Sequence, residues 1–109
     1  MTSLNEMTAD LIGTTVVIRS NMSGVHVGTL MGVDGPAVRL HDSRRLLEWH
    51  VANRAGVSLT EVAVAGIDAN NSHVSMTCPV MIVYDVCEII PAHGLCAATV
   101  AHAPTFVPH

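Results

Sequence analysis

Residues 15–30 read TVVIRSNMSGVHVGTL, and this stretch decides the fold. Its first part, residues 15–19, is β-branched and apolar, which is typical of a strand. A turn cluster at residues 20–24 follows, and residues 25–30 alternate like a returning strand. Together these segments predict an antiparallel hairpin with a glycine-containing loop. Gly28 inside the second strand indicates a bulge, or a close approach by another backbone or a ligand.

The strand pattern continues after this hairpin. Asp34-Gly35-Pro36 is a turn signal, residues 37–40 form a short expected strand, and residues 41–43 can turn again. Residues 44–50 read RRLLEWH, a pattern that fits either one helical turn or a strand. The strand-like segments before them favour a strand.

Helix signals flank a second β-rich region. Ser58-Leu59-Thr60-Glu61 is a capping box, in which the Ser58 hydroxyl is expected to accept from a helical amide, and Gly66 is placed to end the helix. Residues 80–90 form a long β-rich run that Pro91 stops, and residues 95–101 favour a short terminal helix. The sequence therefore predicts an α+β fold: an antiparallel β-sheet of about five strands with one or two short helices.

A chain of 109 residues is long enough for one domain with a real core. We expect a flexible leader over residues 1–13, a single ligand-binding domain over residues 14–103 and an irregular tail over residues 104–109. The first 13 residues lack the basic start and apolar segment of a signal peptide, and no run reaches the length of a membrane span. Three cysteines without a Cys-x-x-Cys pair favour a reducing cytoplasm.

The composition narrows the class of protein. Hydrophobic residues make up 50% of the chain and charged residues 13%, against a usual charged share of about 25%. This excludes a disordered chain and, with a mean hydropathy of +0.45, predicts a homo-oligomer that covers apolar surface. A formal net charge of −4 argues against polymeric nucleic acid as a partner, and no membrane partner is expected.

Arginine next to tryptophan is the first candidate binding feature. All five basic residues are arginines, whose planar donor forks suit phosphate. If residues 44–50 are a strand, Arg45 shares a face with Trp49, and Arg44 points the other way. Guanidinium groups for phosphate and an indole for a base suit a nucleotide. The alternative is that Trp49 belongs to the core and that both arginines are solvated.

The loop of the first hairpin is the second candidate. The amide of Asn21 and the hydroxyl of Ser23, beside Gly24, are groups that read a base edge or a ribose. The alternative is that these residues only make the turn.

A coherent catalytic set is missing from the sequence. The seven histidines show no metal-ligand spacing, so neither a metal nor another cofactor is expected. Cys87 lies in an apolar strand and is expected to be a buried, inert thiol. Asp85 and Glu88 are three apart on a strand, so they face opposite sides and cannot pair as acid and base. We therefore expect that the protein is not an enzyme.

Four segments in order carry a family resemblance: residues 17–30, 43–49, 58–66 and 86–91. They resemble the phage-encoded Thoeris anti-defence sponges, and the resemblance covers roughly residues 15–91. It implies a viral protein in the host bacterial cytoplasm that sequesters cyclic nucleotide immune signals without turnover. The ligand implied is glycocyclic ADP-ribose, held at the boundaries of a dimer or an assembly of dimers. Some members also take cyclic oligonucleotides at separate sites.

The resemblance implies that Arg44, Arg45 and Trp49 contact the phosphate and the base of the ligand. Leu46-Leu47 stands where bulkier rings are typical of the family. Two other functions stay open: a structural oligomeric phage protein without a small-molecule ligand, and a small nucleotide hydrolase, against which the missing catalytic set argues.

Overall fold

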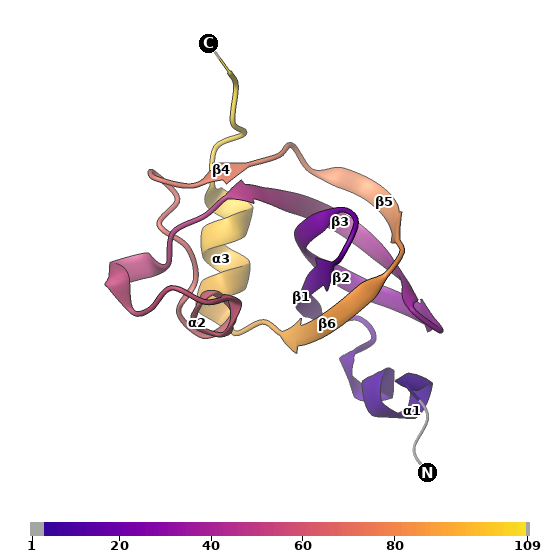
Figure 1. The fold of residues 1–109 in the computed structure, drawn as a ribbon. Coiled ribbons are helices and arrows are strands. Elements are labelled where there is room, and N and C mark those ends of the chain that lie inside the picture. Colours follow the sequence, from indigo (N-terminus) through magenta and orange to yellow (C-terminus); the bar gives the residue numbers. More distant parts are fainter. Residues whose placement is uncertain (1–3, 109) are drawn as a thin grey trace.

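A computed structural model describes the backbone of residues 4–108 and the side chains from residue 6 onward. Within these residues the chain forms a six-stranded antiparallel sheet with three short helices, which confirms the α+β class (Figure 1). In chain order the elements are α1 (Leu4–Thr8), β1 (Thr15–Ser20), β2 (Gly24–Asp34), β3 (Ala37–Glu48), α2 (Leu59–Ala65), β4 (His73–Val74), β5 (Cys78–Val83), β6 (Val86–Pro91) and α3 (Gly94–His102). The predicted first hairpin is confirmed as β1 and β2, which pair from Thr15↔Thr29 to Ser20↔Gly24.

The expected long strand over residues 80–90 is divided between two partners. The strand order is β4-β3-β2-β1-β6, and β5 pairs with β3. Because β1 and β3 are both antiparallel to β2, β5 and β6 run in the same direction. Only residues 84 and 85 separate them, and Asp85 makes the bend with a φ of 55°. The run therefore passes from β3 across to β1 and curls the sheet into a partly open barrel (Figure 1).

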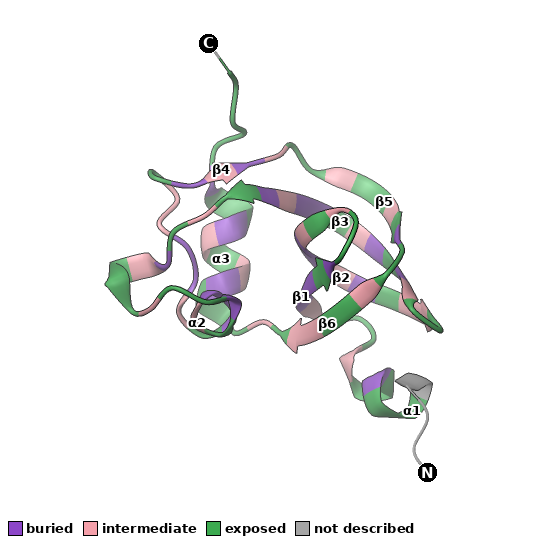
Figure 2. Cartoon of the chain, in the orientation of Figure 1, coloured by how far each residue is buried: buried purple, intermediate pink, exposed green. Residues whose placement is uncertain are grey.

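Two core clusters lie on the two faces of this curled sheet. Side chains alternate along β1, so Val16 and Ile18 belong to the inner cluster and Val17 to the outer one. The inner cluster fills the barrel and consists of Val16, Ile18, Leu30, Val38, Leu40 and Val83. The outer cluster includes the buried side of α2 and of α3, which lie together against the sheet (Figures 1 and 2).

The expected turn at residues 41–43 is wrong, because β3 runs without a break from Ala37 to Glu48. Asp42 has a φ of 52°, and opposite it the β2–β3 register shifts between Val27 and Thr29. Gly28 lies at this bulge. A Cβ added to it would lie 2.8 Å from Cβ of Ser43. The prediction of a bulge with a close backbone approach is therefore confirmed.

Helix α2 begins and ends where the sequence predicts. Ser58 is the N-cap residue, and Gly66 follows the last turn with a φ of 87°. The expected capping bond is wrong in detail: the Ser58 hydroxyl donates to the carboxylate of Glu61 instead of accepting from an amide. This hydrogen bond is the main reason that the pKa of Glu61 is lowered. The expected terminal helix is α3.

The described residues near both ends of the chain contact the rest of the fold. Residues 1–3 of the expected leader lie outside the described residues, and Leu4–Thr8 forms a short helix. Leu11 packs against the inner cluster, and the amide of Gly13 donates to the carbonyl of Leu30 over 2.7 Å. In the expected irregular tail, the amide of Phe106 donates to Val74 O over 2.8 Å. These contacts extend the folded unit at both ends.

Candidate functional site

The segment that was predicted as a strand or a helical turn is a strand up to Glu48. Arg44 and Arg45 therefore project to opposite faces, as alternation requires. Arg44 is buried against α3, where Nη1 donates to the carbonyls of Val100 (2.7 Å) and Ala103 (2.5 Å), and Nε donates to Ser75 O (2.8 Å). Desolvation lowers the pKa of Arg44. Its donors satisfy carbonyls at the end of a helix, so the expected phosphate contact at Arg44 does not fit this structure.

Trp49 lies apart from Arg45. The strand ends at Glu48, and the β3–β4 register is irregular between Leu46 and Glu48, so alternation does not continue to residue 49. The indole is half-buried and packs against the outer core cluster. The expected shared face of Arg45 and Trp49 is therefore wrong, and the core alternative describes Trp49.

Arg45 instead lines a hollow at one mouth of the barrel, together with Ser23. The hollow has a volume of about 260 Å³, and β5 with its following residue forms much of the wall; the lining residues are Met22, Ser23, Arg45, Met81, Ile82, Val83 and Tyr84. The guanidinium of Arg45 has no hydrogen bond or ion pair with any side chain or carbonyl of residues 4–108, and its Nε atom is buried. A guanidinium that lines a hollow without a protein acceptor can form charge-assisted hydrogen bonds with a ligand, which makes this hollow the best candidate for an anionic ligand.

The other arginines differ from Arg45. Arg19 forms an ion pair with Glu88 over 3.2 Å, and Arg44 is bonded to carbonyls. Arg39 and Arg54 are exposed, so water solvates them. Arg45 thus differs from the other four arginines because it is partly buried and has no hydrogen-bond or ion-pair partner among the described residues.

His26 lies behind this hollow and was not predicted as a site residue. It is fully buried, pairs in register with Arg45, and its Nε2 lies 2.9 Å from the hydroxyl of Ser23. The pKa of His26 is lowered to about 4, mainly by burial and then by the charge of Arg45, while a hydrogen bond to the backbone of Ser23 opposes the shift. The imidazole is therefore neutral at pH 7. Its alternation with Gly28 and Leu30 is the sequence signal that places it on the inner face.

A buried serine fixes the two walls of the hollow relative to each other. The hydroxyl of Ser20 accepts from the amides of Met22 (3.2 Å) and Ser23 (3.3 Å), and it donates to the carbonyl of Tyr84 over 2.7 Å. The loop and the end of β5 are therefore held together without a ligand. Of the predicted loop residues, Ser23 lines the hollow. The backbone N–H of Asn21 donates to the carbonyl of Asp85, and Gly24 adopts a φ of 83°, so the backbone of these two residues makes the turn.

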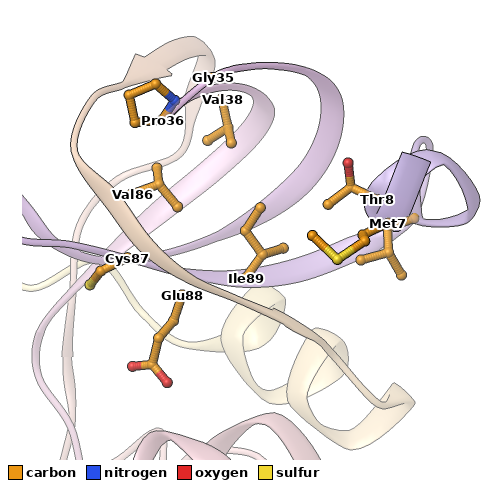
Figure 3. A pocket seen from close by; sticks show the side chains of 10 residues that line it. Met7, Thr8, Gly35, Pro36, Val38, Val86, Cys87, Glu88 and Ile89 are labelled. Carbon is orange, nitrogen blue, oxygen red and sulfur yellow. The ribbon is translucent and has the colours of Figure 1, made fainter. Parts of the chain in front are cut away.

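A second hollow lies between α1 and β6 and has a volume of about 280 Å³ (Figure 3). Its walls are mainly apolar, with Met7, Val38 and Ile89 among them. Figure 3 shows Glu88 directed away from Val38, and this carboxylate is already paired with Arg19. Among the described residues, no positively charged side chain lines this hollow, which makes it less suited to a phosphate than the barrel mouth.

A third hollow is larger, about 580 Å³, and polar. The carboxylates of Glu48 and Asp68 line it with the exposed Arg54. Glu48 contacts the ring nitrogens of His50 and His73 at 3.6 and 3.3 Å. Asn71 donates to Asp68 over 2.8 Å, which is the main reason that the pKa of Asp68 is lowered. Two carboxylates make this hollow less favourable than the barrel mouth for an anion.

The thiols are arranged differently from the expectation. Cys87 is exposed on β6 rather than buried, because β6 is an edge strand that, among the described strands, pairs with β1 alone. Cys96 is the buried thiol, and desolvation raises its pKa to about 11. In the described part of the chain, no group of three or more histidine, cysteine or acidic side chains could hold a metal ion. None of the helices in residues 4–108 is long and apolar enough to cross a bilayer.

The protein is therefore a small, partly open antiparallel barrel backed by two helices, with its candidate site at the mouth that Arg45 lines. Residues 13–100 match the model of a domain of unknown function, DUF6948, and the chain belongs to that family. A search of the curated proteins finds no match.

Proposed function

We propose that this protein is a binding protein without turnover, which sequesters a phosphate-bearing cyclic nucleotide at the mouth of the barrel. The resemblance to Thoeris anti-defence sponges suggests glycocyclic ADP-ribose, and cyclic oligonucleotides as further ligands, in the cytoplasm of an infected bacterium. The observation that carries the proposal is the half-buried guanidinium of Arg45, which has no acceptor among residues 4–108. A ligand phosphate supplies that acceptor and forms charge-assisted hydrogen bonds.

The rim of the hollow supports a nucleotide rather than a bare anion. Tyr84 and Met22 are exposed at the mouth, beside Arg45. An aromatic ring next to a cation suits a base that is joined to a phosphate, and stacking contributes about 1–3 kcal/mol. In this proposal Tyr84 takes the stacking role expected of Trp49.

The size of the hollow favours a site shared between copies. Its volume of about 260 Å³ lies just below the roughly 300–1,000 Å³ of pockets that enclose a drug-sized ligand. Val80, Ile82 and Tyr84 are exposed on or next to β5, beside the mouth. A second copy that covers these side chains would deepen the hollow and remove apolar surface from water. We therefore include a dimer or an assembly of dimers in the proposal.

Ligand retention tests the proposal. The protein is incubated with cyclic ADP-ribose isomers, separated from free ligand and denatured by heat, and the released molecule is identified by mass spectrometry. We expect intact ligand from the parent chain and from the control Arg39→Ala, and little from Arg45→Ala. An altered product would indicate an enzyme, and no retention by the parent would favour a structural oligomer.

A further inference from the structure

One hydrogen bond behind the mouth hollow decides which group Ser23 offers to a ligand. Nε2 of His26 and Oγ of Ser23 lie 2.9 Å apart. A neutral imidazole carries one proton on either nitrogen, and a hydroxyl can donate or accept. Either the ring donates to Ser23, or Ser23 donates to the ring. Because Ser23 lines the hollow, the direction of this bond sets the chemistry of the wall.

The other ring nitrogen distinguishes the two directions. His26 is 0% exposed, and its Nδ1 atom has no hydrogen-bond partner among the described residues. If Ser23 donated to Nε2, the ring proton would lie on Nδ1 as a buried N–H without an acceptor. If the ring donates from Nε2, Nδ1 keeps only a lone pair. Backbone groups of native proteins show which is less costly: an orphaned buried N–H is rarer than an under-bonded acceptor.

The contact between the ring and the backbone of Ser23 favours the same direction. This hydrogen bond raises the pKa of His26, against the effects of burial and of Arg45. A bond that raises the pKa of an imidazole is one that the ring donates, because donation stabilises the protonated form. Nε2 is the ring nitrogen that has a partner, so the proton of the neutral ring belongs on the side of Ser23.

Donation from the ring fixes the role of the Ser23 hydroxyl. Its oxygen accepts from His26, so its own proton remains for another acceptor. Within residues 4–108 this hydroxyl has no further hydrogen bond. The backbone of the loop is held as well, because the amide of Ser23 donates to Oγ of Ser20 over 3.3 Å. Ser23 and Arg45 therefore place two donors on the wall of one hollow.

We infer that His26 is a positioning residue, whose Nε2–H donates to Oγ of Ser23 and thereby makes the Ser23 hydroxyl a donor that, with Arg45, selects phosphate oxygens. The inference rests on the proposed function and deepens it, because it assigns the specificity of the same hollow. Ionised phosphate oxygens only accept, so they match two neighbouring donors. His26 acts through Ser23 from inside the barrel and does not touch the ligand.

Nitrogen NMR of the full chain without ligand tests the position of the ring proton. The signals of His26 are identified as those that the His26→Gln variant lacks. At pH 7 we expect a proton on Nε2 and a bare Nδ1. A proton on Nδ1 would overturn the inference, whichever ligand the hollow binds.

Calorimetric titration with inorganic pyrophosphate, in a buffer free of other oxyanions, tests the donor role of Ser23. We expect the parent to bind pyrophosphate and Ser23→Ala to bind it about ten-fold more weakly, as loss of one hydrogen bond to a charged acceptor implies. Ser23→Thr keeps a hydroxyl and is the matched control, with an affinity within about two-fold of the parent. No binding by the parent, or equal affinity in Ser23→Ala, would overturn the inference.

A double-mutant cycle separates positioning from a purely structural role of His26. His26→Leu removes the ring donor and should weaken pyrophosphate binding, whereas His26→Gln keeps an N–H for Ser23 and should bind more tightly than His26→Leu. In the Ser23→Ala background, His26→Leu should change the affinity by less than about two-fold, because the group that His26 positions is absent. Equal losses in both backgrounds would overturn the inference.

Failure of the inference and failure of the proposed function give different results. Pyrophosphate binding with the expected dependence on Ser23 and His26, but without nucleotide retention, would contradict only the proposed function. Nucleotide retention that is unchanged in Ser23→Ala would contradict only the inference. If His26→Leu does not fold, the position of the ring proton and the two Ser23 variants still decide the outcome.

Discussion

Arg44 and Arg45 are neighbours in the chain, but their guanidinium groups serve opposite faces of β3. Arg44 is bonded to carbonyls of α3, whereas Arg45 lines the mouth of the barrel without an acceptor among residues 4–108. The same residue type therefore stabilises the fold at one position and is available to a ligand at the next. Substitutions at the two positions should have separable effects.

Arg44→Ala should lower the free energy of unfolding by about 3 kcal/mol, because it leaves buried carbonyls of α3 without their charged donor. Chemical denaturation measures the change. Arg39→Ala on the same strand is the control, and since Arg39 is exposed its effect should stay within about 0.5 kcal/mol. Equal stability of the two variants would contradict the structural role of Arg44.

Arg45→Ala should weaken binding of a cyclic ADP-ribose isomer about ten- to a hundred-fold, because the ligand loses a charge-assisted hydrogen bond. Trp49→Ala should lower stability instead, since the indole packs against the outer core cluster. Calorimetry and denaturation of both variants check the two effects. A Trp49→Ala variant that stays stable but loses binding would place the stacking surface at Trp49 rather than at Tyr84.

Gly28→Ala should destabilise the protein by about 1–3 kcal/mol, because the new methyl group would lie 2.8 Å from Cβ of Ser43 and 2.9 Å from its Cα. Gly32→Ala is the matched control on the same strand, since a Cβ there meets nothing within 4 Å. Thermal unfolding of both variants measures the difference. A neutral Gly28→Ala would show that β2 and β3 separate easily at the bulge.

The buried His26 should make stability fall as the pH is lowered from about 6.5 towards 4. Its pKa is about 4 in the folded protein and near 6.5 when unfolded, so in this window the unfolded chain binds the extra proton. The loss approaches about 1.4 kcal/mol per pH unit. Denaturation of the parent and of His26→Gln at pH 7, 6 and 5 isolates this contribution from other groups. Parallel pH profiles for the two proteins would contradict it.

Self-association should depend on the exposed side of β5. Sedimentation of the parent at micromolar concentration should give a species heavier than the 11.5 kDa of one chain. Val80→Asp should shift it towards the monomer, because a carboxylate is costly in an apolar interface. Val64→Asp on α2, which is also exposed, is the control and should leave the mass unchanged. A monomeric parent would refute the oligomer.

The sequence by itself determined the local elements of this protein. The hairpin at residues 15–30, the turn at Asp34-Gly35-Pro36 and helix α2 between Ser58 and Gly66 all follow from turn and capping residues. These signals act between neighbours in the chain, so they can be read without a fold. The opposite orientation of Arg44 and Arg45 also follows from the alternation of a strand.

Only the tertiary structure decided which face of each strand became the inside. The bend at Asp85 carries β5 and β6 from β3 to β1, and this closure encloses His26 and leaves Cys87 exposed. It also joins Tyr84 to the loop around Ser23, although about 60 residues separate them in the chain. Trp49 turns to the core because the regular pairing ends at Glu48. Burial of a side chain depends on contacts between segments far apart in sequence, and local patterns do not encode those contacts.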